Sequence, residues 1–268
     1  MSRSVFPFIR KDGILMELTW VTYLIVCPLV FLAGLIDSVA GGGGLISLPA
    51  YMAAGLSPLQ AAGTNKLSAC LGTVASTTRF VRDRKIDWKA GIFAAIGAFP
   101  GSWVGAWLQQ LIPQETVRVL MIVAIPVVAA VVLRKKEMNG RCLVSAEFYR
   151  PMALAIGLMI GFYDGLIGPG TGTFLILMFT MVLGMEAVMA SGTAKVVNLT
   201  SNVAALVSYM MVQPDNVLFA LALPAAACGI VGNWLGASLT VKKGMGFIRY
   251  MLLVVLVLLL AKMVMDVL

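Results

Sequence analysis

Two lysines and two aspartates interrupt the apolar stretches of this sequence at matching places. Asp37 and Asp164 each end a long apolar run and are followed by a glycine-rich break. Lys66 and Lys195 lie a few residues into the next long apolar run. A lysine inside a membrane span costs roughly 2.5–3.5 kcal/mol on insertion scales. Each of these lysines therefore needs a charged partner, an aqueous path or a ligand.

Helical spacing places further hydrogen-bond donors beside the lysines. Lys195, Asn198 and Asn202 follow one another at helical intervals, so in a helix they share one face. An ammonium group surrounded by amide and hydroxyl donors suits an oxyanion. The candidate substrate-binding side chains on this face, and on the equivalent face of the first half, are Asn65, Lys66, Thr73, Lys195, Asn198 and Asn202.

The glycine-rich breaks offer a second way to hold an anion. Each break precedes an apolar run, at 44–56 and at 172–184, that is shorter than the ~20 residues needed to cross a bilayer. Short helices that start at the breaks would expose backbone N–H groups and the positive ends of their dipoles. We expect both breaks and both lysines to meet near the middle of the membrane. The glycines predicted to contribute to the site are Gly43, Gly44, Gly170 and Gly172.

The ionisable residues also permit other roles. Asp37 with Lys66, and Asp164 with Lys195, could form charge pairs that hold each half of the chain together. Alternatively, the aspartates could carry a coupling proton. We expect no metal site and no cofactor, because the chain has no histidine, its four cysteines are scattered and it has no nucleotide-binding loop.

The composition is that of a polytopic all-α membrane protein. The chain is 60% hydrophobic and 12% charged, and its mean hydropathy is +0.96. Its 268 residues leave room for about eight spans and for no separate soluble catalytic domain. The net charge of +8 comes largely from basic residues in the connections between apolar runs. We interpret it as a topology signal and expect no nucleic-acid partner.

Further matches in the same order predict an internal duplication. Gly63-Thr-Asn-Lys66 corresponds to Gly192-Thr-Ala-Lys195, and Gly101-Ser-Trp-Val-Gly105 corresponds to Gly232-Asn-Trp-Leu-Gly236. We interpret the tryptophan–glycine motifs as sites of close helix packing. The predicted organisation is a cytoplasmic N-terminal segment (1–17), a first membrane repeat (18–134), a cytoplasmic connector (135–150) and a second membrane repeat (151–268).

Each predicted repeat holds four long apolar runs and one short, glycine-headed run. If the short runs are broken or re-entrant helices that do not cross, most basic residues fall on one side of the membrane together with both termini. This favours about eight transmembrane helices in two four-span repeats that run in the same direction, with both termini cytoplasmic. The long runs are expected at 18–37, 60–81, 88–111, 116–133, 151–164, 187–211, 216–240 and 245–266.

These motifs resemble the sulfite exporter TauE/SafE family, whose members are described as four-span-repeat sulfite and organosulfonate permeases. The similarity runs from about Leu32 to the C-terminus and is closest to bacterial inner-membrane members. It implies a transporter of small, often sulfur-containing anions. The residues that carry it are Gly34-x-x-Asp37-x-x-Ala-Gly41-Gly-Gly-Gly44, Ala62-Gly-Thr-Asn65-Lys66, Gly161-Phe-Tyr-Asp164-Gly and Ala194-Lys195-Val-Val-Asn198-Leu-Thr-Ser-Asn202.

The function expected from the sequence is therefore secondary transport of a small anion in the inner membrane, and no enzymatic activity. A sulfur oxyanion or organosulfonate leaving the cytoplasm is the first expectation, and a small carboxylate moving in either direction is the alternative. Tyr163-Asp164 also resembles half of the intramembrane aspartyl protease pattern, with Asp37 as the second carboxylate of a remote alternative. The expected partners are the anion and the lipid bilayer; monomer and homodimer both remain open.

Overall fold

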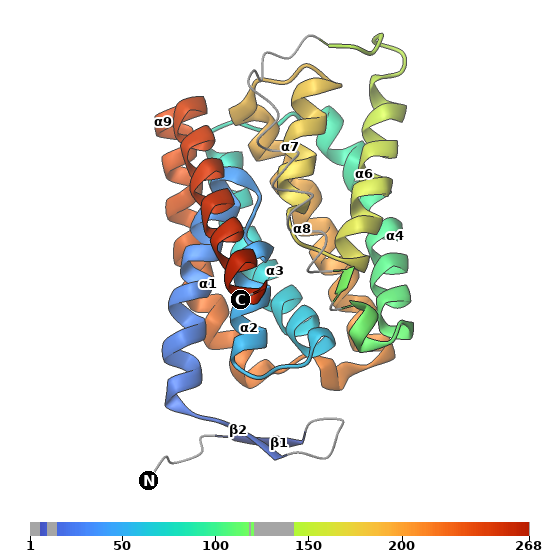
Figure 1. Cartoon of the computed structure of the whole chain (residues 1–268). Helices are drawn as coiled ribbons and strands as arrows, with labels where there is room; N and C mark the ends of the chain where they lie inside the picture. Colours follow the sequence, from blue (N-terminus) through green and yellow to red (C-terminus); the bar gives the residue numbers. More distant parts are fainter. Residues whose placement is uncertain (1–5, 10–14, 118, 121–141, 268) are drawn as a thin grey trace.

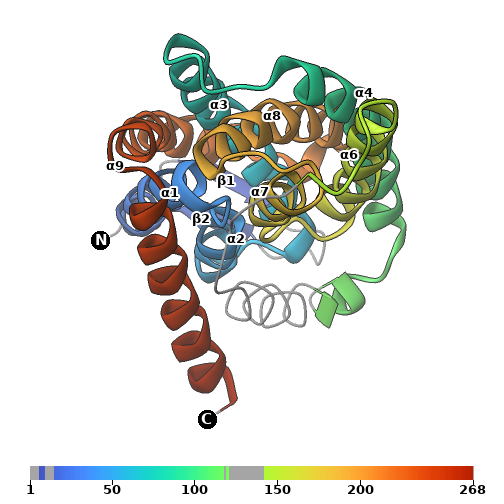
Figure 2. The ribbon, with the colours of Figure 1, turned by 90° about the horizontal axis from the view of Figure 1, so that it is seen from above.

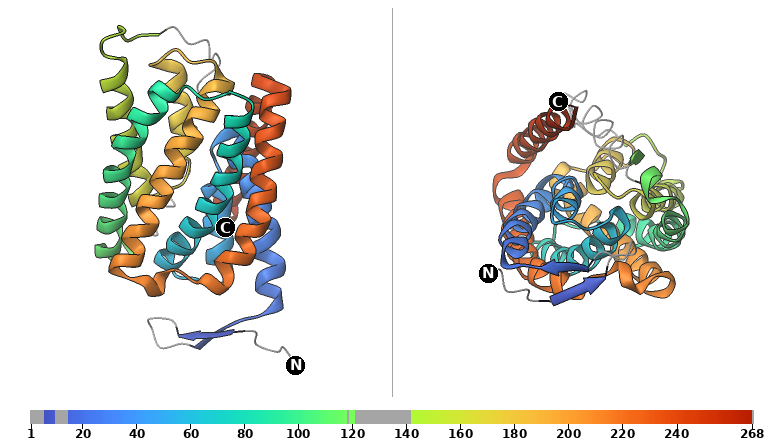
Figure 3. Two further views of the ribbon diagram at one scale, coloured as in Figure 1. Left: turned by 180° about the vertical axis from the view of Figure 1, so that it is seen from behind. Right: turned by 60° about the horizontal axis from the view of Figure 1, so that its bottom comes forward.

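Within the residues that the structure describes, the regular secondary structure is helical apart from one short β-hairpin (Figure 1). The computed structural model describes residues 6–9, 15–117, 119–120 and 142–267. Strands β1 (Phe6–Ile9) and β2 (Leu15–Leu18) pair antiparallel and lie at the end of the bundle from which the first helix starts (Figure 3). The expectation of an all-α membrane protein is confirmed for the bundle itself, whereas the hairpin was not predicted.

The helices of the first half match the predicted apolar runs. The short helix follows a break at Gly41, where φ is +77°, a value that favours glycine. The third helix starts with a capping box in which Ser57 and Gln60 satisfy each other's backbone N–H groups. The predicted run 116–133 lies mostly outside the described residues. The helices are α1 (Trp20–Ala40), α2 (Gly44–Ala53), α3 (Pro58–Arg82) and α4 (Trp88–Leu111).

The second half shows the same sequence of long, short and long helices. The last helix is interrupted at Gly244, which has φ +66° and ψ −154°, so it consists of two helices that meet at a bend. Beyond the bend the chain diverges from the bundle (Figure 2). A 3₁₀ turn, η1 (Pro214–Asn216), precedes it. The helices are α6 (Tyr149–Leu166), α7 (Thr171–Met181), α8 (Ala187–Val212) and α9 (Phe219–Val267).

Within the described residues, three helices are long and apolar enough to cross a membrane by length and composition: Trp20–Ala40, Trp88–Leu111 and Phe219–Gly244. The lysine-bearing helices α3 and α8 are longer than α1 but are not among the three. They lie in the interior of the bundle, where many of their polar side chains are buried. Polar content is tolerated in a membrane helix that faces other protein elements instead of lipid.

The short helix α2 returns the chain to the end where α1 begins. Leu18, Leu56 and Leu59 belong to one buried cluster, so the start of α3 lies beside the start of α1. In the second half, Ala153 clusters with Met185 in the same way, so α7 returns the chain to the start of α6. Each long helix and its short successor therefore enter and leave at the same end of the bundle.

Corresponding helices of the two halves run in opposite directions. Gly63 at the start of α3 packs against Tyr209 near the end of α8, and Gly192 at the start of α8 packs against Phe80 near the end of α3. These two helices are thus antiparallel, and α6 starts at the end where α3 finishes. The expectation that both repeats run in the same direction is wrong, because it assumed that the short helices do not carry the chain back.

In this arrangement, groups of basic residues that were expected on one side of the membrane lie at opposite ends of the bundle. The first residue of α1, Trp20, lies at the hairpin end of the bundle, whereas the connection after Arg82 lies at the far end (Figure 1). The start of α6 lies at the far end as well, because α6 runs antiparallel to α3 and α1. The expected placement of the N-terminal segment beside Arg79–Lys89 and the connector is therefore wrong.

Glycines allow helices of the two halves to pack at backbone contact. A Cβ added at Gly101 or Gly105 of α4 would overlap carbonyl oxygens of α6, and one added at Gly232 or Gly236 of α9 would overlap carbonyl oxygens of α1. Both pairs run parallel. The interpretation of the tryptophan–glycine motifs as close packing is confirmed, and each contact joins one half to the other.

Candidate functional site

The ammonium group of the first lysine, Lys66, is fully hydrogen-bonded to buried acceptors. Lys66 Nζ on α3 lies 2.6 Å from Asp164 Oδ2 on α6. It also donates to the Asp164 carbonyl oxygen at 3.1 Å and to Asn202 Oδ1 at 3.2 Å. An ammonium group has three protons, and each of them has an acceptor here. The cation is thereby compensated at the centre of the bundle.

The partner aspartate is held by further donors from the second half. Ser201 on α8 donates to Asp164 Oδ2 at 2.7 Å, and Thr171 at the start of α7 donates to Oδ1 at 2.7 Å. The carboxylate side chain is only 4% exposed. Hydrogen bonds that satisfy both oxygens are what a buried carboxylate requires, so this pair is rigidly placed.

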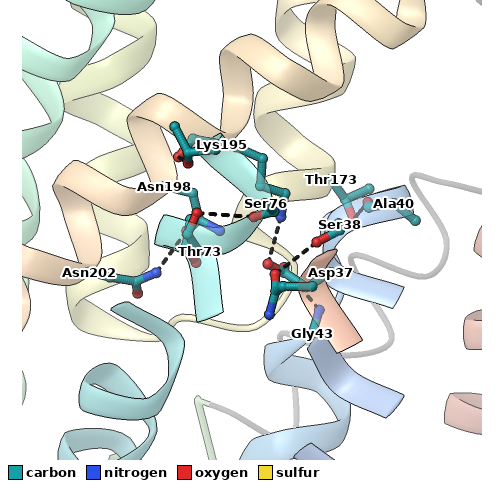
Figure 4. A network of polar contacts seen from close by, with 12 residues as sticks. Asp37, Ser38, Ala40, Gly43, Thr73, Ser76, Thr173, Lys195, Asn198 and Asn202 are labelled. Carbon is teal, nitrogen blue, oxygen red and sulfur yellow. Dashed lines mark hydrogen bonds and ion pairs between the residues drawn. The ribbon is translucent and has the colours of Figure 1, made fainter. Parts of the chain in front are cut away.

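The second pair has fewer partners. Lys195 Nζ on α8 lies 2.6 Å from Asp37 Oδ2 at the end of α1, and the lysine side chain is 1% exposed (Figure 4). The other carboxylate oxygen of Asp37 accepts the Gly43 N–H at 3.3 Å. The Asp37 side chain is 16% exposed, so it is the most accessible of the four charged groups.

Both ion pairs connect one half of the chain to the other. The pairing considered from the sequence, Asp37 with Lys66 and Asp164 with Lys195, is therefore wrong. The physical reason is the opposite direction of the halves, which brings each lysine within reach of the aspartate of the other half. The pairs link the halves instead of holding each half together.

The two glycine-rich breaks touch each other. A Cβ added at Gly172 would lie 2.5 Å from the Cα of Gly41, a clash between backbones. Thr173 of α7 donates to the Ala40 carbonyl oxygen at the end of α1, at 2.7 Å. The contact brings the N-terminal ends of α2 and α7 to one place, with the partial positive charge that such ends carry.

A cavity lies between the breaks and the lysine-bearing helices. The space open to the centres of water molecules is about 60 Å³. One water molecule needs about 10–15 Å³ by this measure, so the cavity can hold several waters or one small anion. The residues predicted from the sequence that line it are Asp37, Gly43, Gly44, Asn65, Lys66, Thr73, Asp164, Gly170, Gly172, Asn198 and Asn202.

Lys195 is the predicted site residue that does not line the cavity. Its ammonium group lies behind Asp37, and the carboxylate faces the cavity in its place. Asn198 and Asn202, on the same helix, do line it, and Asn202 Nδ2 donates to Asn198 Oδ1 at 3.4 Å (Figure 4). Within the described residues, the side-chain amides of Asn65 and of Asn198 (its Nδ2) donate no hydrogen bond, so they remain available to a ligand.

Sequence reasoning missed several polar residues that line the cavity. Asn233 lies between the packing glycines of α9, where it accepts a hydrogen bond from Ser38 at 2.8 Å. Gln109 lines the cavity from the end of α4 and accepts from the Tyr209 hydroxyl. The signal that could have identified Asn233 is that it is a polar residue within an apolar run. It was not predicted because the neighbouring glycines were interpreted only as packing residues. The other missed lining residues with hydroxyl groups are Ser47, Ser68 and Thr171.

The arrangement does not resemble the centre of an aspartyl protease. A catalytic dyad needs two carboxylates that share a proton. Here Asp37 is bound by Lys195, and Asp164 is bound by Lys66, Thr171 and Ser201. Among the described residues, no three histidine, cysteine, aspartate or glutamate side chains gather where they could hold a metal ion.

Known proteins are similar in sequence to this chain over most of its length. The model of the family described as "Sulfite exporter TauE/SafE" matches residues 26–263. The "Probable membrane transporter protein YfcA" of Escherichia coli K12 is 33% identical over 235 residues, which cover 88% of this chain and 87% of that protein. No solved structure matches the chain.

Relatives from other bacteria carry similar descriptions. A "Probable membrane transporter protein" of Haemophilus influenzae is 33% identical over 236 residues, covering 88% of this chain and 92% of that protein. The "Probable membrane transporter protein ORF9" of a Sinorhizobium species is 31% identical over 236 residues, covering 88% and 90%. The similarity therefore extends over nearly the full length of each relative.

Proposed function

Because the chain belongs to the sulfite exporter TauE/SafE family of membrane transporters, we propose that it is a secondary transporter that binds a small anion in the central cavity. The observation that carries this proposal is the meeting of two helix N-termini and unpaired amide donors around one small space. Helix N-termini attract anions through their N–H groups and dipoles. Discontinuous helices around a central site are common in secondary transporters.

The charges around the cavity favour a bound anion that interacts with one lysine in particular. Lys66 has no proton left for a ligand, whereas Lys195 has one acceptor within the described residues, Asp37 Oδ2. An anion that enters beside Asp37 would compete with this carboxylate for the Lys195 ammonium. In the same position it would reach the amide of Asn198 and the N-terminus of α2.

The proposed substrate is a sulfur oxyanion or a short organosulfonate, exported from the cytoplasm. A cavity of about 60 Å³ suits an ion of a few heavy atoms, and the amide donors suit its oxygens. The inside-negative membrane potential favours export by ~2.3 kcal/mol per charge per 100 mV. The alternative substrate is a small carboxylate, moving in either direction, because the same donors would bind it.

The membrane arrangement that we propose has two repeats of opposite orientation in the inner membrane. The eight long apolar runs predicted from the sequence are proposed to lie in the bilayer as helices, and α2 and α7 return from its middle. The positive-inside rule assigns the end of the bundle that carries basic side chains to the cytoplasm. The start of α1 then faces the outside, which replaces the expected cytoplasmic N-terminus. The described basic residues at or near that end are Arg79, Arg82, Arg84, Lys85, Lys89, Arg150, Lys242 and Lys243.

Thermal stabilisation of the detergent-purified protein tests the proposed function. A ligand that binds the folded state raises apparent stability by RT ln(1 + [L]/Kd), so even millimolar affinities are measurable. Sulfite, sulfate, thiosulfate, taurine, sulfoacetate and short carboxylates are the ligands to compare. We expect a sulfur anion to raise the melting temperature of the natural protein and of the exposed-lysine control Lys89→Met, but not that of Lys66→Met/Lys195→Met.

The outcomes separate the candidates. Stabilisation by carboxylates alone would select the alternative substrate. If no anion stabilises the protein, or if the double variant responds like the natural protein, the central cavity is not an anion site. Uptake of the stabilising anion into right-side-out and inside-out vesicles then gives the direction of transport.

A further inference from the structure

The central cavity extends toward one end of the bundle only. From the site between the breaks it continues along Ala33, Leu48, Ala62 and Gln109, all in the first half. Ala62 adjoins Gly63, which packs against the Asn216 backbone near the start of α9, and Gln109 lies near the end of α4. Both places belong to the end of the bundle at which the hairpin lies (Figure 1).

The counterparts of these residues in the second half do not line the cavity. Motif matches pair each first-half residue with the residue at the same place in the second half, so that Ala62 corresponds to Ser191 and Gln109 to Thr240. The counterparts are buried, and none of them lines the cavity. They are Ile160, Leu175, Ser191, Val197 and Thr240, opposite Ala33, Leu48, Ala62, Ser68 and Gln109.

One of these counterparts carries a polar group without a partner. The Ser191 hydroxyl is fully buried and has no hydrogen bond within the described part of the chain. Burying a hydroxyl without a hydrogen-bond partner is unfavourable, and apolar alanine at the same position would avoid that penalty. Ser191 adjoins Gly192, which packs against the Lys85 backbone at the far end of the bundle. The polar group therefore lies where a path to that end would begin.

We infer that the substrate anion takes a second path to the far end of the bundle, lined by Ser191, Thr240, Ile160, Leu175 and Val197. In that conformation the helices of the second half pack as those of the first half do in this structure, with a cavity between them. The helices of the first half then pack closely, as those of the second half do in this structure. The Ser191 hydroxyl then contacts water or the passing anion instead of remaining unpaired. The inference rests on the proposed function and on the repeats of opposite orientation.

The physical basis is the likeness of the two halves. Two halves with matching helices, glycine breaks and charge pairs can exchange packings at a small difference in free energy. The breaks supply the places where the backbone can turn, since Gly41, Gly168 and Gly170 have φ of +77°, +92° and +80°. Both ion pairs cross between the halves, so a relative shift of the halves changes both together.

Cysteine accessibility tests this second path. The background is the full chain with Cys27, Cys70, Cys142 and Cys228 replaced by serine or alanine, in which Ala62→Cys, Ser191→Cys and Thr240→Cys are made singly. Ser191→Cys changes one atom, and Ala205→Cys in the buried apolar core of α8 is the negative control. Right-side-out and inside-out vesicles are treated with a membrane-impermeant charged thiol reagent, with and without the anion that stabilises the protein.

We expect Ala62→Cys to react from the hairpin side, and Ser191→Cys and Thr240→Cys to react only from the opposite side. The stabilising anion should change the two reactivities in opposite directions by at least a few-fold. The inference is overturned if Ala62→Cys reacts while Ser191→Cys and Thr240→Cys stay as inert as Ala205→Cys, or if all three react from one side. Thermal stabilisation is measured on the same variants, so a failure of anion binding is distinguished from a failure of the second path.

Discussion

The two lysine–aspartate pairs have the same 2.6 Å separation but very different surroundings. Lys66 donates to three acceptors, and Asp164 accepts from Thr171 and Ser201 in addition. Lys195 has one acceptor in the described part of the chain, and the second oxygen of its partner accepts a single backbone N–H at 3.3 Å. The two ion pairs occupy matching positions in the sequence, but Lys66–Asp164 has many further hydrogen-bond partners and Lys195–Asp37 has few.

The difference indicates a division of labour between the pairs. Breaking a buried ion pair leaves an uncompensated charge, and the penalty grows with burial and with the number of hydrogen bonds lost. The Lys66–Asp164 pair meets both conditions and fastens α3 to α6. The Asp37 carboxylate faces the cavity and is partly exposed, so the Lys195–Asp37 pair can exchange its partner for a ligand at lower cost.

The largest expected effect is on stability when Asp164 is removed. Asp164→Ala leaves Lys66 buried without its carboxylate and should cost ~3–5 kcal/mol of folding free energy. Asp37→Ala should cost clearly less, because Asp37 has fewer partners and more contact with solvent. The apparent melting temperature in detergent measures both, with the exposed Asp215→Ala as control. Equal losses for the two variants would remove the distinction between the pairs.

For transport, we expect the Lys195–Asp37 pair to matter more than the Lys66–Asp164 pair. Lys195→Met should lower the transport rate by about 10- to 100-fold, because a hydrogen bond to a charged group is worth ~1.5–3 kcal/mol. Its melting temperature should fall less than that of Lys66→Met. Vesicle uptake of the stabilising anion and thermal unfolding are measured on the same preparations, with Lys89→Met as control. Undiminished transport by Lys195→Met would contradict its proposed contact with substrate.

A double-mutant cycle sharpens the assignment of partners. Asp37→Asn and Lys195→Met should couple by ~0.5–3 kcal/mol, because contacting residues share the interaction that each mutation removes. Asp37→Asn and Lys66→Met belong to different pairs and should be nearly additive. Melting temperatures of the single and double variants supply the cycle. Strong coupling only in the second combination would restore pairing within each half.

The smallest expected effect concerns the donors around Asp164. Thr171→Val removes one hydrogen bond but leaves Lys66 and Ser201 in place, so a loss of ~1 kcal/mol is expected. Thr78→Val, whose hydroxyl bonds a carbonyl on an exposed surface, is the matched control. A loss as large as that of Asp164→Ala would mean that Thr171 itself, and not the network, holds the carboxylate.

Much of the site was predictable because it depends on local chemistry. The helices follow local features: the glycine breaks, the i, i+3, i+7 spacing of Lys195, Asn198 and Asn202, and the apolar run that ends at Asp37, in the last turn of α1. Asn233 and Gln109 were not predicted as lining residues, since nothing local distinguishes a polar side chain that faces a cavity from one that bonds a neighbouring helix. Lys195 was predicted to line the cavity, but its partner Asp37 takes that place.

By itself, the sequence determined the membrane setting, the helix boundaries, the family and the residues that converge at the centre, because hydropathy and glycine act over one helix at a time. Only the tertiary structure decided which lysine meets which aspartate, and in which direction each half runs. Both depend on contacts between helices far apart in the chain. A short helix that returns the chain to the end at which it entered reverses the direction of every later helix. Neither the composition nor the spacing of residues shows whether a short helix does so.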